Sequence, residues 1–173
     1  MTITEIKALP AVTGRSLVDP ELFARLTARI VTDHDEIDRE PAERIMDRAL
    51  AFLGTCAVST APLSPAKFVD IGWHTFILHT KDYREFCERI AGRFIEHVPT
   101  DDNSQDCQMC NGCQDDSGGD GGKAHGALSA SLTALAVADA GYAVDAPMWE
   151  SGGNCSQCQN GCHNDPPPDP KAV

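Results

Sequence analysis

The clearest helical signature in the chain is DPELFARLTARI, residues 19–30. Asp19 is a typical N-cap, Pro20 suits the first helical position, and Glu21 places an anion in the first turn. The apolar residues that follow recur at helical spacing: Leu22, Phe23, Leu26 and Ile30. This period places them on one stripe, which predicts an amphipathic helix that buries the stripe.

Similar signatures predict three more helices. The second begins at Pro41 and ends before Pro62. The third has Ser64 as N-cap and Pro65 at its first position, and the fourth is capped by Thr80. The apolar face of the second helix is Ile45, Met46, Ala49, Leu50, Phe52, Leu53 and Cys56. That of the third is Phe68, Val69, Ile71, Trp73, Phe76 and Ile77, and that of the fourth is Tyr83, Phe86, Cys87, Ile90 and Phe94. The sequence therefore predicts an all-α fold, a small helical bundle of about four to five helices.

Composition divides the chain into five segments. They are an extended N-terminal arm (1–18), a helical core (19–99), an acidic Gly- and Cys-rich loop (100–125), an additional helix with a strap (126–150) and a Cys- and Pro-rich tail (151–173). The loop and the tail contain few apolar side chains, so both are predicted to be mobile unless a ligand clamps them.

The additional helix is predicted from apolar residues that again recur at helical spacing. They are Leu128, Leu132, Leu135 and Ala136. Gly141 is expected to end this helix, because glycine readily adopts the left-handed conformation of a helix C-terminus. Four apolar residues are expected to anchor the strap that follows: Tyr142, Val144, Met148 and Trp149.

The charge and the cysteine content limit the function. Among 173 residues, 26 Asp and Glu outnumber 14 Lys and Arg, for a net charge of -12, so nucleic acid and membrane partners are not expected. Residues 1–12 lack the basic start and apolar segment of a secretory signal, so a cytoplasmic location is expected. In a reducing compartment, the eight cysteines favour metal ligation or redox chemistry over disulfides.

Six cysteines form two clusters with the spacings C-x2-C-x2-C and C-x2-C-x3-C-H. The residues are Cys107, Cys110 and Cys113, then Cys155, Cys158, Cys162 and His163. Two thiolates with two residues between them can bind one ion, so the first two cysteines of each cluster together predict a four-thiolate zinc site. The other cysteines and His163 would serve a second ion or bridge. An iron–sulfur cluster uses the same thiolates, and free thiols or adventitious disulfides in flexible segments are a third alternative.

A second set of candidate ligands lies in the predicted core. Asp70 and His74 are four residues apart, so they share one face of the third helix. Cys87 lies on the next helix, and His97 follows the end of that helix. Together they are predicted to surround one metal ion. The alternative is structural: Asp70 orients His74, Cys87 fills the core, and His97 caps a helix terminus.

The stretch from residue 69 to 99 contains Asp70-x2-Trp73-His74, followed by Tyr83, Phe86-Cys87 and GRFIEHVP, residues 92–99. This pattern resembles the glycine-rich domain-containing protein family, in a short form similar to actinobacterial members. The resemblance implies that a set of residues forms a signature of the fold or of a site: Asp70, Trp73, His74, Cys87 and His97. It implies no activity. The commoner form of that family is W-H-x-H, whereas residue 76 here is Phe, so a ligand at that position is missing.

The sequence therefore favours a binding function over a catalytic one. No hydrolase, nucleotide-binding or zincin motif occurs, and the single candidate nucleophile is Cys87, with His74 or His97 as its base. The leading hypothesis is a metal-binding accessory protein that holds zinc or another thiophilic metal on a helical scaffold. The alternative is a non-enzymatic interaction module that binds another protein and whose Cys-rich tails are flexible or are substrates for modification.

Overall fold

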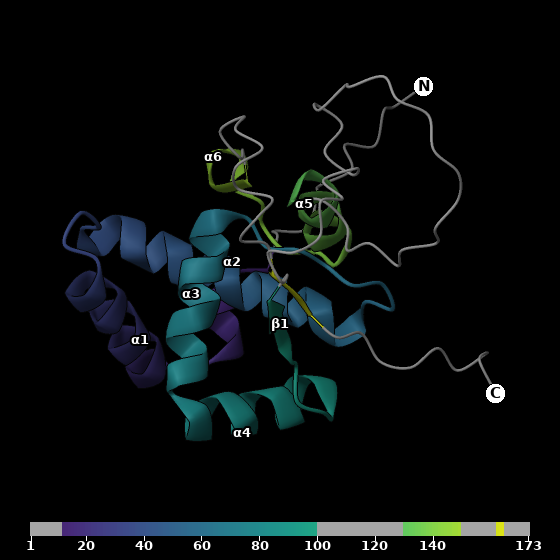
Figure 1. The fold of residues 1–173 in the computed structure, drawn as a ribbon, viewed down its shortest axis with the longest axis horizontal. Helices are drawn as coiled ribbons and strands as arrows, with labels where there is room; N and C mark the ends of the chain where they lie inside the picture. The colour runs from purple at the N-terminus through teal and green to yellow at the C-terminus, as the bar shows by residue number, and fades with distance from the viewer. Residues whose placement is uncertain (1–11, 100–129, 150–161, 165–173) are drawn as a thin grey trace, which may run out of the picture.

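The computed structural model describes residues 12–99, 130–149 and 162–164 (Figure 1). Within these residues the chain forms six α-helices, one 3₁₀ helix and one two-stranded sheet. The elements are η1 (Gly14–Leu17), α1 (Pro20–Asp33), α2 (Arg39–Val58), α3 (Lys67–Leu78), α4 (Thr80–Ala91), β1 (His97–Pro99), α5 (Ala130–Asp139), α6 (Ala146–Trp149) and β2 (Cys162–Asn164). The predicted all-α fold is confirmed. Among the helices described, none has both the length and the apolar character that crossing a membrane requires.

Helix α1 begins as the sequence predicts. Asp19 is the N-cap, and its carboxylate accepts a hydrogen bond from the backbone N–H of Leu22 at 2.9 Å. Pro20 occupies the first helical position. The predicted apolar stripe is buried in full: Leu22, Phe23, Leu26 and Ile30. A local capping signature and a local period are sufficient here, because both depend on neighbours within one or two turns.

Helix α2 is the centre of the molecule. Every residue from Ala49 to Cys56 is buried, because α1, α3, α4, α5 and η1 all pack on this helix. Figure 1 shows α2 running across the molecule behind α3. A helix that is buried on all sides must be apolar on all sides, which explains its long apolar run. It begins at Arg39, so Pro41 lies within the first turn, where its missing N–H is tolerated.

Helix α3 begins at Lys67, and the predicted start at Ser64 is wrong. The N–H of Ser64 donates to Oγ1 of Thr133 (3.2 Å), and the N–H of Leu63 donates to Oδ1 of Asn164 (2.6 Å). Both acceptors come from distant segments of the chain, and they hold this segment as a loop with Leu63 fully buried. A proline signature in the local sequence cannot reveal such long-range bonds.

The chain reverses direction after α4. Gly92 follows the helix in the left-handed conformation (φ 64°), which glycine adopts at little cost. Phe94, predicted to extend the helix face, lies beyond the helix, and its ring packs edge-on against Tyr83 at 5.2 Å between centroids. Ile95 is fully buried, and its carbonyl accepts a hydrogen bond from the Tyr83 hydroxyl (2.7 Å). These contacts return the chain to the bundle, where it forms β1.

Helix α5 ends before Gly141 as predicted (φ 88°), but not all of the apolar residues that predicted this helix are buried. Leu132 and Leu135 are 49% and 62% exposed, whereas Thr133 and Val137 are buried. Thr133 faces inward because its hydroxyl accepts the hydrogen bond from the loop before α3. The sequence of this helix is only weakly amphipathic, so it does not determine which face is buried. The hydrogen bond of Thr133 to the loop does.

Close packing holds two segments, α6 and η1, against the bundle. Of the four predicted anchors, Met148 and Trp149 are buried in α6, which packs on α3, whereas Val144 is 38% exposed. Within the arm expected to be extended, Gly14–Leu17 instead form η1, and Gly14 lies so close to α2 that a Cβ there would collide with its backbone. Glycine is therefore required at this crossing. The loop and tail predicted to be mobile lie outside the described residues, except for β2.

Candidate metal centre

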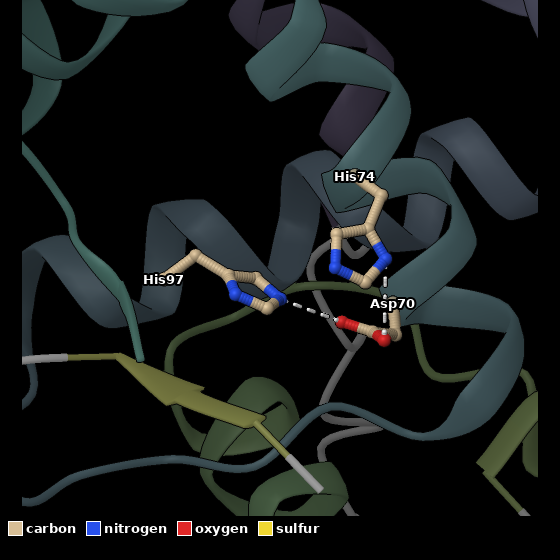
Figure 2. Close-up of side chains that lie close together, drawn as sticks. All are labelled: Asp70, His74 and His97. Carbon is tan, nitrogen blue, oxygen red and sulfur yellow. Dashed lines mark hydrogen bonds and ion pairs between the residues drawn. The ribbon is translucent and has the colours of Figure 1, made fainter. Parts of the chain in front are cut away.

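Three of the predicted core ligands meet at one point. Asp70 and His74 come from α3 and His97 comes from β1, and one potential ligand atom from each lies within 4.8 Å of the other two. Oδ1 of Asp70 is 3.2 Å from Nε2 of His97, and Oδ2 of Asp70 is 3.4 Å from Nδ1 of His74. Figure 2 shows one carboxylate contacting both imidazoles. The group combines one oxygen donor with two nitrogen donors.

The two parts of this group are positioned by different physical causes. Asp70 and His74 share a helix face because they are four residues apart, as the sequence predicts. His97 is 23 residues beyond His74 and reaches the group through the turn at Gly92 and the anchored Ile95. The sequence alone therefore predicts the pair on α3, and the fold supplies the third donor.

Aromatic packing fixes the ring of His97. Its centroid lies 4.5 Å from the ring of Trp73 and 4.4 Å from the ring of His74. Trp73 is fully buried, and its indole N–H donates to the Tyr83 hydroxyl at 2.9 Å. Tyr83 in turn donates to the carbonyl of Ile95, so one buried hydroxyl connects α3, α4 and the approach to β1. Such a support restricts the ring orientation of a ligand, as the surroundings of metal sites commonly do.

The group lies at the edge of the core with one side open to solvent. The side chains of His97 and Asp70 are 13% and 21% exposed, whereas that of His74 is 57% exposed. An ion at this point would be reached from the His74 side without opening the bundle. The partial burial also lowers the local dielectric constant, which strengthens the attraction between the carboxylate and a cation.

The donor set matches the chemistry of first-row transition metals. Two imidazoles and one carboxylate occur in catalytic zinc sites and, as a facial triad, in non-haem iron sites. Donors about 2.0–2.1 Å from a tetrahedral zinc ion lie roughly 3.3–3.4 Å from one another. The two imidazoles contact different oxygens of Asp70, at 3.2 and 3.4 Å, and one potential ligand atom from each residue lies within 4.8 Å of the other two, so the three donors are close enough to converge on one ion.

The structure does not bring the fourth predicted core ligand, Cys87, to this group. Among the described residues, the cluster within 4.8 Å consists of the carboxylate and the two imidazoles alone. Burial raises the pKa of the Cys87 thiol, although hydrogen bonds with the backbone of Ile95 and with Tyr83 oppose that shift. A thiol must lose its proton to ligate a metal, so this environment favours the structural interpretation of Cys87.

The free energy of unfolding is expected to fall at alkaline pH because the core buries two thiols and a tyrosine hydroxyl. Burial raises the pKa of Cys56 and of Cys87 above their usual value of 9.0, and it also raises the pKa of Tyr83. Above about pH 9 the unfolded chain releases these protons while the folded chain retains them, so stability falls as pH rises. Urea unfolding at pH 8 and pH 10 should show this loss. Cys87→Ala should reduce the loss, and an equal loss in both proteins would contradict the assignment.

Most of the predicted tail ligands lie outside the described residues. They are Cys107, Cys110, Cys113, Cys155 and Cys158. Cys162 and His163 lie in β2, where their backbones pair with Pro99 and Val98 of β1. The last part of the second cysteine cluster therefore runs beside the strand that carries His97.

The sequence did not predict a role for Asn164, the residue that joins β2 to the bundle. It is fully buried and stands opposite His97 in the sheet. A strand of three residues is too short to show an alternation of polar and apolar residues. An asparagine among other polar residues has no sequence feature that marks it as buried. The proline run at residues 166–168 favours extended backbone, but it does not identify a pairing partner.

Comparison with known proteins gives one match. A family model described as UCP032817-like matches residues 15–115, more than half of the chain. The matched range contains Asp70, His74 and His97 and does not contain β2. No curated protein and no solved structure matches the chain.

Proposed function

The chain belongs to the UCP032817-like family, whose description names no activity, and we propose that it is a transition-metal-binding protein with its centre at Asp70, His74 and His97. The observation that carries the proposal is the convergence of one carboxylate and two imidazoles from two separate elements. A purely structural pair of histidines requires no such mutual approach of three ligand atoms. The supporting packing of Trp73 on His97 favours a ring held in one orientation.

Zinc is the metal that we propose for this site. It binds imidazole and carboxylate donors in tetrahedral geometry, and the potential ligand atoms of the three residues lie within 4.8 Å of one another. Iron and other divalent first-row metals share these ligands, so metal identity depends on geometry and supply as well as on donor type. The excess of acidic residues would attract any of these cations toward the protein.

The cysteine clusters are a second part of the proposal. In this scheme the first two cysteines of each cluster bind a zinc ion through four thiolates, and the core group binds a separate ion. The pairing of β1 with β2 supports the idea that the second cluster and the core group lie in neighbouring parts of the molecule. A cytoplasmic location would keep those thiols reduced.

The core site is tested in a chain whose six tail cysteines are replaced by serine, termed the serine-substituted chain. Its substitutions are at Cys107, Cys110, Cys113, Cys155, Cys158 and Cys162. Equilibrium dialysis against zinc, followed by elemental analysis, should give about one ion per chain. Bound zinc should also raise the melting temperature, because a ligand that binds only the folded state at 100 times its Kd stabilises it by about 2.7 kcal/mol.

Two results would separate this proposal from its rival. A serine-substituted chain that binds no divalent metal under anaerobic conditions would contradict the core site. A wild-type chain that is also metal-free would favour the interaction module instead, with the helical bundle as the docking surface. Retention of zinc by the wild-type chain alone would assign metal binding to the cysteine clusters.

A further inference from the structure

Strand β2 is attached to the loop before α3 by two hydrogen bonds from one residue. Oδ1 of Asn164 accepts from the N–H of Leu63 at 2.6 Å, and the N–H of Asn164 donates to the carbonyl of Leu63 at 3.2 Å. Both residues are fully buried. Two bonds to one backbone position fix both the place and the direction of β2 at this point.

The same residue is paired with a ligand of the proposed metal centre. In the antiparallel sheet, Asn164 stands opposite His97. Leu63 lies four residues before the start of α3, the helix that carries Asp70 and His74. Asn164 therefore connects the two elements from which the donors come, and it does so from a position 67 residues beyond His97 in the chain.

This arrangement gives the C-terminal strand influence over the geometry of the site. β1 has three residues, and His97 is the first of them. Within the described residues, β2 is its pairing strand. Loss of the Asn164 anchor would free the backbone at His97, while the α3 pair of Asp70 and His74 would remain in place through its own helix.

We propose that Asn164 is a positioning residue for the metal centre, so that metal binding and docking of the C-terminal strand strengthen each other. This inference rests on the proposed function of the core group. A bound ion would hold His97 beside α3 and thereby favour the β1–β2 pairing, and the paired strand would hold His97 ready for the ion. Coupling of two binding equilibria is reciprocal, so each effect requires the other.

One consequence concerns the cysteine clusters. The second cluster ends at Cys162, two residues before Asn164 and opposite Pro99. A ligand that binds the tail cysteines would act on the strand that positions His97. The coupling thus gives the tail a route to regulate the affinity of the core site, without any cysteine contacting the core ion.

The test measures zinc affinity in the serine-substituted chain with Asn164→Ala, using Thr133→Val as the matched control. Thr133 is also fully buried and accepts a hydrogen bond from the same loop, at Ser64, but it has no place in the sheet with His97. Asn164→Ala should weaken zinc binding by about 10- to 100-fold, as loss of supporting contacts does at metal sites. Thr133→Val should change the affinity by less than about twofold, because it leaves β1 paired.

A second measurement examines the reverse direction of the coupling. Zinc should slow hydrogen exchange at the amides of Leu63 and Asn164 in the serine-substituted chain, and Asp70→Ala should remove that effect. Unchanged zinc affinity in Asn164→Ala, or an equal loss in Thr133→Val, would overturn the positioning role while leaving the core site intact. Absence of zinc binding before any of these substitutions would overturn the core site, and this inference with it.

Discussion

Replacing Asp70 with alanine in the serine-substituted chain is expected to weaken zinc binding by about 100- to 1,000-fold. Structural zinc sites with four protein ligands bind with a total of about 10–16 kcal/mol, so one ligand accounts for roughly 2.5–4 kcal/mol, and each ~1.4 kcal/mol is a factor of ten. Asp70 contributes the single carboxylate of the group and contacts both imidazoles. Its loss removes the one negative charge among the three donors and the contact that the carboxylate makes with each imidazole. Competition titration with a zinc-binding dye measures the change.

The matched control for this substitution is His79→Ala. His79 is a half-buried histidine at the end of the same helix, 3.9 Å from the carboxylate of Asp82, and it lies outside the group of three donors. Its removal should leave zinc affinity unchanged within about twofold. Equal losses in Asp70→Ala and His79→Ala would show that the histidines bind zinc non-specifically, and the core site would be wrong. Unchanged affinity in Asp70→Ala would contradict it equally.

Tyr83→Phe is expected to destabilise the fold by about 2–6 kcal/mol. The buried hydroxyl accepts from the indole N–H of Trp73 and donates to the carbonyl of Ile95. Phenylalanine would leave both groups buried without their partner, at about 1–3 kcal/mol each. The free energy of unfolding in urea measures this cost. Because Trp73 and Ile95 position His97, zinc affinity should fall as well.

Tyr142→Phe provides the control for that hydroxyl. Tyr142 is half-buried and packs on α2 beside Gly54, so the substitution removes the same atom from a less enclosed place. Its effect on stability should stay below about 1 kcal/mol. Equal losses of stability in Tyr83→Phe and Tyr142→Phe would mean that the hydrogen bonds from Trp73 to Ile95 through Tyr83 do not stabilise the fold more than an ordinary tyrosine hydroxyl does. The account of how His97 is held would then need revision.

The sequence predicted those features that depend on near neighbours. The cap at Asp19, the stripe of α1 and the termination at Gly141 follow from local geometry, and all three are confirmed. The pairing of Asp70 with His74 follows from helical spacing in the same way. Each of these needs only the chemistry of four or five consecutive residues.

The features that the sequence did not predict depend on contacts between distant segments. Ser64 does not cap α3, which begins at Lys67; its N–H instead donates to Thr133, 69 residues away, and the segment is held as a loop. The same bond turns Thr133 inward, and the apolar Leu132 beside it is exposed. His97 reaches α3 through the turn at Gly92 and the anchored Ile95, and it lies in a strand whose partner residue, Asn164, is 67 residues further along the chain. Patterns within one segment carry no information about such partners.

The resemblance to the glycine-rich domain-containing proteins stays a prediction, and it can be compared with the geometry of the site. That family's commoner W-H-x-H form would place a second histidine at residue 76, where this chain has Phe76. Phe76 is fully buried and packs against Tyr83 and Phe86, so it faces the core. The second imidazole of the proposed site comes from His97 instead, on a different element.

The most direct measurement of the central claim is X-ray absorption at the zinc edge of the zinc-loaded, serine-substituted chain. Coordination by His74, His97 and Asp70 predicts nitrogen and oxygen neighbours at about 2.0–2.2 Å, the multiple scattering of two imidazoles, and no sulfur at about 2.3 Å. The imidazole scattering should fall by half in His97→Ala. A sulfur shell, which only Cys56 or Cys87 would supply, or a spectrum unchanged in His97→Ala, would contradict the proposed centre.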